Sequence, residues 1–272
     1  MQPPQTFASW ATVLAAALLA CSGEGMTESV CLTTQPIFWG PSTRHVDLPP
    51  EVSGAIGALY WLDEDESLSL LCTVTRVRPG WVLGAAHCFR LEAGEEPDLD
   101  SQIAAARIDF SPRLPVASAD CRSSDEEPPR EPIYQLLEVR LHPTLDLALI
   151  AIGDYADTPF VDVTKEAPEA GLELILAGFG WTELDTQGKL RLLPTTLSAL
   201  GDCTFLVDSG PEAGACAGDS GGPALRHSDA TWELTGTLNK GSPGCTGVDQ
   251  YVDLSSAQAR DWLRDNLPPS PF

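Results

Sequence analysis

Basic residues are scarce in this chain. Its 272 residues include 16 lysines and arginines against 39 aspartates and glutamates, which gives a formal net charge of −23 at pH 7. Nucleic acids and anionic membrane surfaces attract proteins chiefly through lysine and arginine. The charge balance therefore argues against a nucleic-acid partner and favours a strongly solvated surface.

The patterns typical of zinc sites and of membrane spans are also missing. The chain has four histidines and eight cysteines, but no Cys-x-x-Cys pair and no group of them at ligand spacing, so we expect no metal site. The apolar run at residues 10–20 is shorter than the roughly 20 residues that cross a bilayer. We therefore expect no transmembrane helix, and no motif indicates a cofactor.

Residues 1–21 have the character of an export signal. The apolar run ends in Leu-Leu-Ala-Cys, which resembles a bacterial lipoprotein cleavage site, after which a lipidated Cys21 would attach the chain to a membrane. Residues 2–20 carry no lysine or arginine, whereas export signals normally have positive charge before the apolar run. The alternative is a plain secretory signal cut nearby. Either reading predicts an exported protein, a cell-envelope lipoprotein or a secreted one, and eight cysteines fit an oxidising compartment.

The strongest chemical motif is Gly-Asp-Ser-Gly-Gly-Pro at residues 218–223. A serine hydroxyl is a poor nucleophile at neutral pH unless a base takes its proton and donors stabilise the resulting oxyanion. Gly218 leaves room for the backbone to turn so that its N–H and that of Ser220 point the same way. The motif indicates an activated serine if a base and an orienting group occur elsewhere.

Two further segments supply those groups. His87 follows the apolar run Trp-Val-Leu-Gly-Ala-Ala at residues 81–86, and Asp146 interrupts an apolar segment at residues 145–150. A carboxylate in such a segment is costly to bury unless a group such as an imidazole N–H donates to it. The other three histidines, His45, His142 and His227, we interpret as structural or exposed.

With Ala-Ala-His-Cys, Asp-Leu-Ala-Leu and Gly-Asp-Ser-Gly-Gly-Pro in that order, the sequence resembles the chymotrypsin/trypsin-like serine endopeptidases, from about residue 37 to the C-terminus. The resemblance implies an all-β fold of two six-stranded antiparallel β-barrels with a C-terminal α-helix. It implies a polypeptide substrate, with Ser220 as nucleophile, His87 as base, Asp146 as orienting carboxylate, and the N–H groups of Gly218 and Ser220 as oxyanion hole.

The domain organisation follows from the resemblance and the turn pattern. We expect a signal peptide at 1–21, a linker or pro-segment at 22–36, and a protease domain at 37–272, with barrels at about 37–156 and 157–254 and a helix at 255–267. Ser255 and Gln258 form a capping box at the start of that helix. Short apolar runs separated by Pro, Gly and Asp loops indicate strands. They lie at residues 56–62, 68–77, 81–86, 133–141, 145–152, 172–177, 190–197, 232–238 and 250–254.

The resemblance also assigns a substrate pocket. Gly214 stands where trypsin-like enzymes carry the aspartate that attracts arginine or lysine, and Asn239 and Gly241 flank a lysine where relatives have Ser-Trp-Gly. Asp249 is either a buried carboxylate on the opposite pocket wall or an exposed loop residue. Relatives also pair the aspartate before the nucleophile, here Asp219, with a freed N-terminal amine, for which Ile37 is the nearest match.

Disulfides are implied in the same way. The family pattern pairs Cys72 with Cys88 and Cys216 with Cys245, and leaves Cys31, Cys121 and Cys203 without an assigned partner. The competing interpretation of the whole chain is a catalytically inactive protease fold that serves as a binding or adhesion module on the cell surface. The lysine between Asn239 and Gly241 and the poor match to the family's freed N-terminus at Ile37 favour that alternative. The complete set of His87, Asp146 and Ser220 favours the enzyme.

Overall fold

The computed structural model describes residues 48–63, 67–89, 98–111, 133–153, 158–182, 187–229 and 231–268. All of these residues belong to one compact unit. The described residues exclude the predicted signal peptide, the segment 22–36, Cys21, Cys31, Ile37, His45 and Cys121. Within the described ranges, no helix is both long and apolar enough to cross a membrane.

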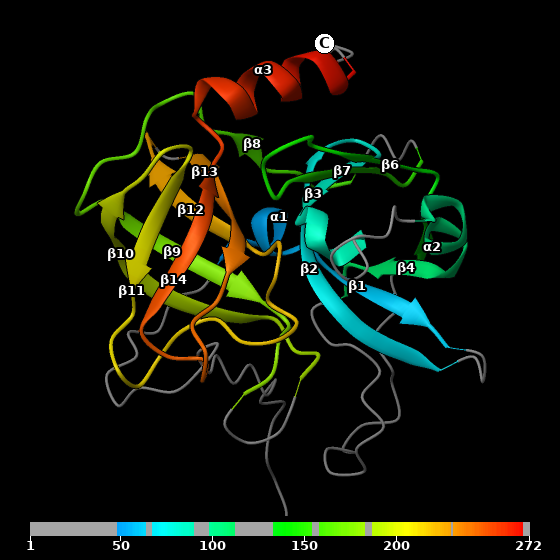
Figure 1. The fold of residues 1–272 in the computed structure, drawn as a ribbon, viewed down its shortest axis with the longest axis horizontal. Coiled ribbons are helices and arrows are strands. Elements are labelled where there is room, and N and C mark those ends of the chain that lie inside the picture. The colour runs from blue at the N-terminus through cyan, green and yellow to red at the C-terminus, as the bar shows by residue number, and fades with distance from the viewer. Residues whose placement is uncertain are drawn as a thin grey trace, which may run out of the picture. The chain divides into compact units, whose positions relative to one another are not determined.

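The first half of the described chain forms a curled antiparallel sheet of seven strands (Figure 1). In sheet order these are β5 (Tyr134–Gln135), β4 (Ala106–Asp109), β1 (Ile56–Leu62), β2 (Leu68–Arg78), β3 (Trp81–Gly84), β7 (Ala148–Ala151) and β6 (Glu138–Leu141). The edge strands β5 and β6 are separated in the chain only by Leu136 and Leu137. Residues 134–141 therefore pair with β4 at one end and with β7 at the other, which curls the sheet toward closure.

The second half forms a closed barrel of six strands. Around the barrel these are β9 (Glu173–Gly178), β10 (Arg191–Leu200), β11 (Thr204–Asp208), β14 (Val248–Asp253), β13 (Thr231–Lys240) and β12 (Pro223–Ser228). β12 pairs with both β9 and β13, and this double pairing removes the free edges of the sheet. A short seventh strand, β8 (Asp162–Val163), lies in the connection between the two halves and adds to β13 in parallel.

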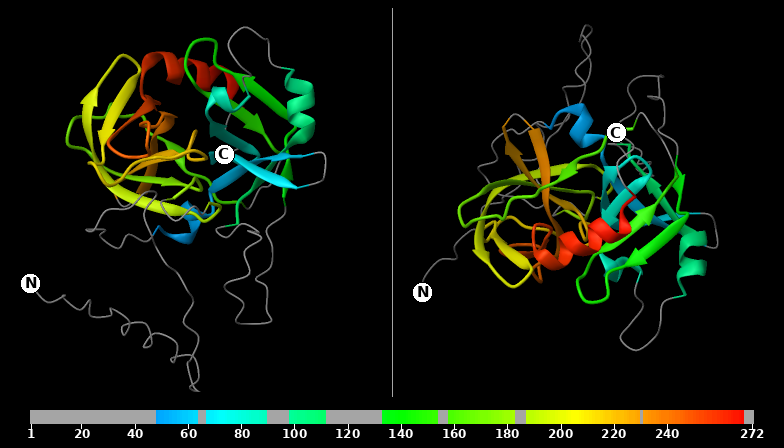
Figure 2. Two further views of the ribbon diagram at one scale, coloured as in Figure 1. Left: turned by 60° about the horizontal axis from the view of Figure 1, so that its bottom comes forward. Right: turned by 90° about the horizontal axis from the view of Figure 1, so that it is seen from above.

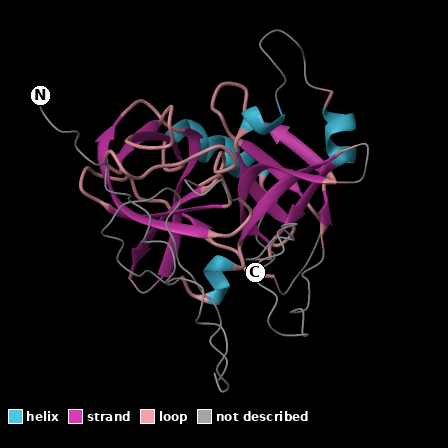
Figure 3. Ribbon diagram, turned by 90° about the horizontal axis from the view of Figure 1, so that it is seen from below, coloured by secondary structure: helices cyan, strands magenta, loops and turns pink. Residues whose placement is uncertain are grey.

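These two sheets confirm the predicted all-β fold, a chymotrypsin-like double barrel with a C-terminal α-helix. Figure 2 shows the two sheets side by side in two further views, and Figure 3 shows how strands dominate the described chain. One cluster of buried residues joins the halves: Leu83 and Leu149 of the first sheet pack with Ala177 and Leu225 of the second. Because apolar burial drives this contact, a common core holds the two sheets together.

The C-terminal helix α3 (Ala257–Asn266) differs from the prediction in its N-cap. Its N-cap is Ser256, whose hydroxyl accepts from the backbone N–H of Ala259, because the hydroxyl of Ser255 donates to Asp253 instead. The ring of Trp262 packs against His142 of the first half.

Three short helical segments had no signal in the sequence analysis. They are α1 (Pro50–Ser53), α2 (Leu99–Ala105) and a 3-10 turn at Ala86–Phe89. α2 begins at Asp98, which accepts from the backbone N–H of Ser101 and so caps the helix. The 3-10 turn carries His87 and therefore leads to the candidate site.

Candidate active site

His87 lies in the 3-10 turn Ala86–Phe89, which follows β3 with only Ala85 between. The next residue, Cys88, forms a disulfide with Cys72 in β2, with a Cα–Cα distance of 6.4 Å. The turn is therefore held from both sides, by the end of a buried strand and by a covalent link to the neighbouring strand. This arrangement fixes the position from which the imidazole extends.

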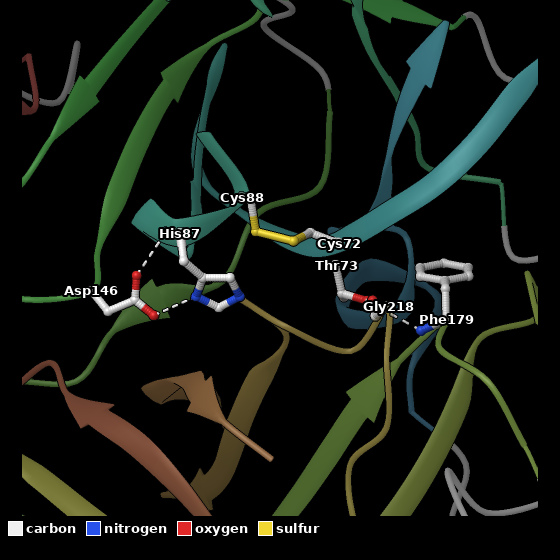
Figure 4. Close-up of a disulfide and its surroundings, with 7 residues drawn as sticks. All are labelled: Cys72, Thr73, His87, Cys88, Asp146, Phe179 and Gly218. Carbon is white, nitrogen blue, oxygen red and sulfur yellow. Dashed lines mark hydrogen bonds and ion pairs between the residues drawn. A yellow bond between two sulfur atoms is a disulfide. The ribbon is translucent and has the colours of Figure 1, made fainter. Parts of the chain in front are cut away.

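Asp146 binds His87 with both carboxylate oxygens (Figure 4). Oδ2 lies 2.6 Å from Nδ1 of the imidazole, and Oδ1 accepts from the backbone N–H of His87 at 2.8 Å. The side chain of Asp146 is 16% exposed and that of His87 is 43% exposed. Because Nδ1 is held by the carboxylate, Nε2 remains for a further partner, which is the orientation that a general base requires.

His142 organises the turn that carries Asp146. Its buried Nδ1 accepts from the backbone N–H groups of Thr144, at 3.1 Å, and Leu145, at 2.8 Å. Two acceptor contacts at one nitrogen require that Nδ1 carries no proton, so the hydrogen of the neutral ring lies on Nε2. The ring also packs against Trp262 with 5.2 Å between centroids. The structural role expected for His142 is therefore specific: it shapes the turn that ends at Asp146.

Ser220 lies in a glycine-rich turn that leads into β12. The flanking residues Gly218 and Gly221 have φ values of 95° and 78°, in the region that favours glycine. A Cβ on Gly221 would lie 2.6 Å from the backbone nitrogen of Ala85 and 2.6 Å from the carbonyl oxygen of Thr73. Glycine is therefore required for this turn to approach the segment that leads to His87.

Thr73 in β2 connects the serine turn to the first sheet (Figure 4). Its backbone N–H donates to the carbonyl oxygen of Ser220, and its hydroxyl donates to that of Gly218, both at 2.9 Å. The same hydroxyl accepts from the backbone N–H of Phe179 at 3.2 Å. Sequence reasoning missed this residue, because a threonine in a strand is ordinary; its place beside Cys72 is the only hint.

The N–H groups of Gly218 and Ser220 are available at this turn. Neither donates to a backbone acceptor within the described ranges, although the N–H groups of Asp219, Gly221 and Gly222 all do. Gly218 and Ser220 are half-buried, so these two N–H groups are open to a further acceptor. Such a pair can receive an oxygen that develops negative charge.

Asp219 fastens the serine turn to the second barrel. It is 2% exposed and accepts from the backbone N–H groups of Gly180 and Cys216, each at 2.8 Å. Burial raises the pKa of Asp219 to about 7, against the effect of these two hydrogen bonds. The nearby charge of Asp249 also raises this pKa, whereas that of Arg191 lowers it.

Three of the four predicted pocket residues lie together. Asp249 accepts from the backbone N–H of Ala215 at 2.8 Å and from that of Ser242 at 2.9 Å, and so bridges the segments that contain Gly214 and Gly241. A Cβ on Gly214 would lie 3.0 Å from the carbonyl oxygen of Cys245. The disulfide between Cys216 and Cys245 joins the same two segments, with a Cα–Cα distance of 4.6 Å.

Asp249 and Asn239, two of the predicted pocket residues, have different surroundings. Asp249 is fully buried, which excludes the exposed-loop interpretation, and burial raises its pKa. The amide of Asn239 donates to Gln250 on the neighbouring strand, at 3.1 Å. Asn239 is therefore paired with β14 rather than with Gly241 or Asp249.

The remaining cysteines and histidines offer little metal-binding chemistry. The sulfur atoms of Cys72 and Cys88 lie within 4.8 Å of a nitrogen of His87, but their disulfide has no thiolate for a metal. His227 is exposed and its ring packs against Trp232 at 5.0 Å. In the described part of the chain, Cys203 is the free cysteine.

Comparison with known proteins places this site in context. The family model described as Trypsin matches residues 53–263. The chain is 28% identical to "CLIP domain-containing serine protease B4" of Anopheles gambiae over 45% of its length, and 25% identical to "Vitamin K-dependent protein C" of Rattus norvegicus over 69%. It is 25% identical to "Urokinase-type plasminogen activator" of Gallus gallus over 84% of its length.

The matches cover 41%, 44% and 57% of these three relatives, so the chain spans only about half the length of the curated proteins it resembles. The family model, in contrast, covers most of this chain and includes His87, Asp146 and Ser220. The protein belongs to the trypsin family.

Proposed function

We propose that this protein is a serine endopeptidase that hydrolyses peptide bonds through His87, Asp146 and Ser220. The observation that carries the proposal is the 2.6 Å contact between Nδ1 of His87 and Oδ2 of Asp146, which leaves Nε2 as the base. Membership of the trypsin family supports the assignment. So does Thr73, which ties the serine turn to the strand beside Cys72.

In the first half of the reaction, Oγ of Ser220 attacks the carbonyl carbon of the scissile bond while its proton passes to Nε2 of His87. The carbonyl oxygen becomes an oxyanion and accepts from the N–H groups of Gly218 and Ser220. Asp146 stabilises the imidazolium that forms. As the C–N bond breaks, the imidazolium gives its proton to the leaving amine, and an ester of Ser220 remains.

In the second half, a water molecule attacks the ester and transfers a proton to Nε2 of His87. The tetrahedral intermediate collapses to release the new carboxyl group, and the proton returns from His87 to Oγ of Ser220. The enzyme is regenerated without any metal or cofactor. Gly214, Gly241 and Asp249 contribute to the pocket that receives the substrate side chain before the cleaved bond, with Asn239 at its margin.

The proposal is tested by incubating the protein with a peptide library and identifying the products by mass spectrometry. The expected result is endopeptidase cleavage by the wild type and none above background by Ser220→Ala. Circular dichroism and thermal unfolding of both proteins establish that each is folded. If the folded wild type and Ser220→Ala both leave the library intact, the chain is the inactive binding module instead.

We also propose that the protein is exported and that residues 37–272 form the protease domain. The disulfides Cys72–Cys88 and Cys216–Cys245 support export, because such bonds persist in oxidising compartments. The test is expression of the full chain in a bacterial host fed with a radiolabelled fatty acid. Label on the wild type but not on Cys21→Ser identifies a lipoprotein, whereas an unlabelled protein in the medium identifies plain secretion.

A further inference from the structure

A cavity of about 470 Å³ lies between the C-terminal helix and the connection that joins the two barrels. The helix contributes Arg260, Leu263 and Arg264, which occupy one face of α3 because they are three and four residues apart. The connection contributes Val163 of β8 and, just after it, Lys165. A ligand there would contact both the helix and the segment between the sheets.

The helix separates this cavity from the candidate active site. Trp262 and Gln258 lie on the opposite face of α3 and contact the turn that carries Asp146, through His142 and Thr144. The cavity is therefore distinct from the site of His87 and Ser220, neither of which lines it, and its occupancy can be studied without proteolytic activity.

The lining of the cavity is positively charged, although the protein as a whole is negatively charged. Four of the 16 basic residues of the chain line it, namely Arg78, Lys165, Arg260 and Arg264, and no lining residue is acidic. In a chain of net charge −23, four cations around one cavity produce a local field of the opposite sign. The cavity therefore favours an anion.

Part of this positive charge has no ion-pair partner among the residues that the structure describes. Arg78 pairs with Asp162 at 2.7 Å, and Arg264 pairs with Asp261 and Asp265 at 2.7 and 3.0 Å, but these carboxylates are largely exposed. Exposed ion pairs contribute little free energy and exchange easily. Among the described residues, no carboxylate lies within ion-pair distance of Lys165 or Arg260.

The rest of the lining is apolar. Its apolar residues are Val163, Leu263, Leu267 and Pro268, the last two of which follow the end of α3. Sites for small molecules commonly have volumes of about 300–1,000 Å³ and combine an apolar lining with a few charged groups that orient the ligand. An inorganic anion would leave the apolar part of this cavity without a partner.

We propose that this cavity binds a small amphipathic carboxylate, with the carboxylate group between Lys165 and Arg260 and the apolar body against Val163 and Leu263. Lys165 and Arg260 select the charge of the ligand, and the apolar lining selects a hydrocarbon body over a fully polar anion. The site is independent of the proposed proteolysis.

The test uses calorimetric titration of the full-length Ser220→Ala protein with octanoate. We expect saturable binding with a Kd of about 1 mM or tighter. Acetate, which has the charge without the body, and octylamine, which has the body with the opposite charge, are expected to bind at least roughly tenfold more weakly. Equal binding of octanoate and octylamine would overturn the proposal.

Two variants locate the site. Lys165→Gln/Arg260→Gln removes the two charges that would hold the carboxylate and is expected to weaken octanoate binding at least roughly tenfold. Lys189→Gln/Lys240→Gln removes two charges outside the cavity and is expected to leave octanoate binding unchanged. Val163→Trp fills the cavity but keeps all four cations, and should also weaken binding. Thermal unfolding verifies that each variant is folded. Undiminished binding by both cavity variants, or no binding by the parent, would contradict the proposal.

Discussion

Asp146 holds His87 at two points, through the imidazole Nδ1 at 2.6 Å and through the backbone N–H at 2.8 Å. The first contact sets the tautomer of the ring, and the second sets the position of the main chain from which the ring extends. A single carboxylate thereby restricts both the rotation and the location of the base. Such restriction is what positioned acid–base chemistry requires.

The first prediction concerns this carboxylate. Asp146→Asn keeps the shape of the side chain, but its amide cannot accept from both donors of His87. The proton of the neutral imidazole then moves from Nδ1 to Nε2, which can no longer act as the base. We expect kcat for peptide hydrolysis to fall roughly 10⁴-fold, with the protein still folded. Steady-state kinetics on a cleaved library peptide measures the effect. Asp162→Asn, in the exposed ion pair with Arg78, is the control and should change kcat less than twofold.

The second prediction concerns the turn that carries Asp146. His142→Phe retains a ring against Trp262 but removes the acceptor for the N–H groups of Thr144 and Leu145. Because two part-buried donors lose their acceptor, the free energy of unfolding should fall by about 0.5–1.5 kcal/mol. We expect kcat to fall while KM changes little, since Asp146 is displaced but the pocket is not. His227→Phe, at an exposed histidine, should alter neither value, and a purely structural role for His142 would leave kcat of the folded protein intact.

The third prediction separates the energetic cost of backbone strain from that of a steric clash at a glycine. Gly221 and Gly210 both have positive φ, 78° and 81°, but a Cβ on Gly221 would meet Ala85 and Thr73, whereas one on Gly210 would meet nothing within 4 Å. Gly210→Ala should cost only the strain, about 1–2 kcal/mol. Gly221→Ala should cost roughly 1–3 kcal/mol more and should also abolish activity, because the serine turn can no longer dock. Urea unfolding of both variants in a Ser220→Ala background measures the difference; equal costs would contradict the docking described.

The fourth prediction uses the pKa of Asp219, which burial raises to about 7. In the unfolded chain this carboxyl has a pKa near 4, so between about pH 4 and pH 7 the folded protein binds the proton more tightly. Stability from this group is therefore fully present below about pH 4 and is lost as the pH rises through about 7. Urea unfolding of Ser220→Ala should show a fall across this range. Adding Asp219→Asn should flatten that fall, and an unchanged slope would contradict the assigned burial.

Residues with distinctive chemistry could be identified from the sequence. His87, Asp146 and Ser220 occur in recognisable motifs, and the structure brings Asp146 to His87 through two hydrogen bonds. The pairs Cys72–Cys88 and Cys216–Cys245 were expected from the resemblance and are both bonded in the structure. Long apolar runs such as β1 and β2 were placed within one residue, because their length and bounding turns leave few alternatives.

Residues that act through their location could not be found in the same way. Thr73 and His142 have roles that depend on which backbone groups lie beside them, and no local pattern encodes those contacts. β11 and β12 were missed because the mixed sequence of each strand gains its strand character from its neighbours in the barrel. The sequence predicts Ser255 as the N-cap, but its hydroxyl donates to Asp253, and Ser256 caps the helix instead.

The most direct measurement of the central claim is covalent labelling with a fluorophosphonate, followed by peptide mass mapping. The reagent reacts with a serine whose proton is removed by a positioned base, so we predict modification of Ser220 alone in the wild type. Labelling should be lost in Ser220→Ala and His87→Ala, while the disulfide Cys72–Cys88 and the fold remain intact. A folded wild-type protein with that disulfide formed and Ser220 unlabelled would contradict the account.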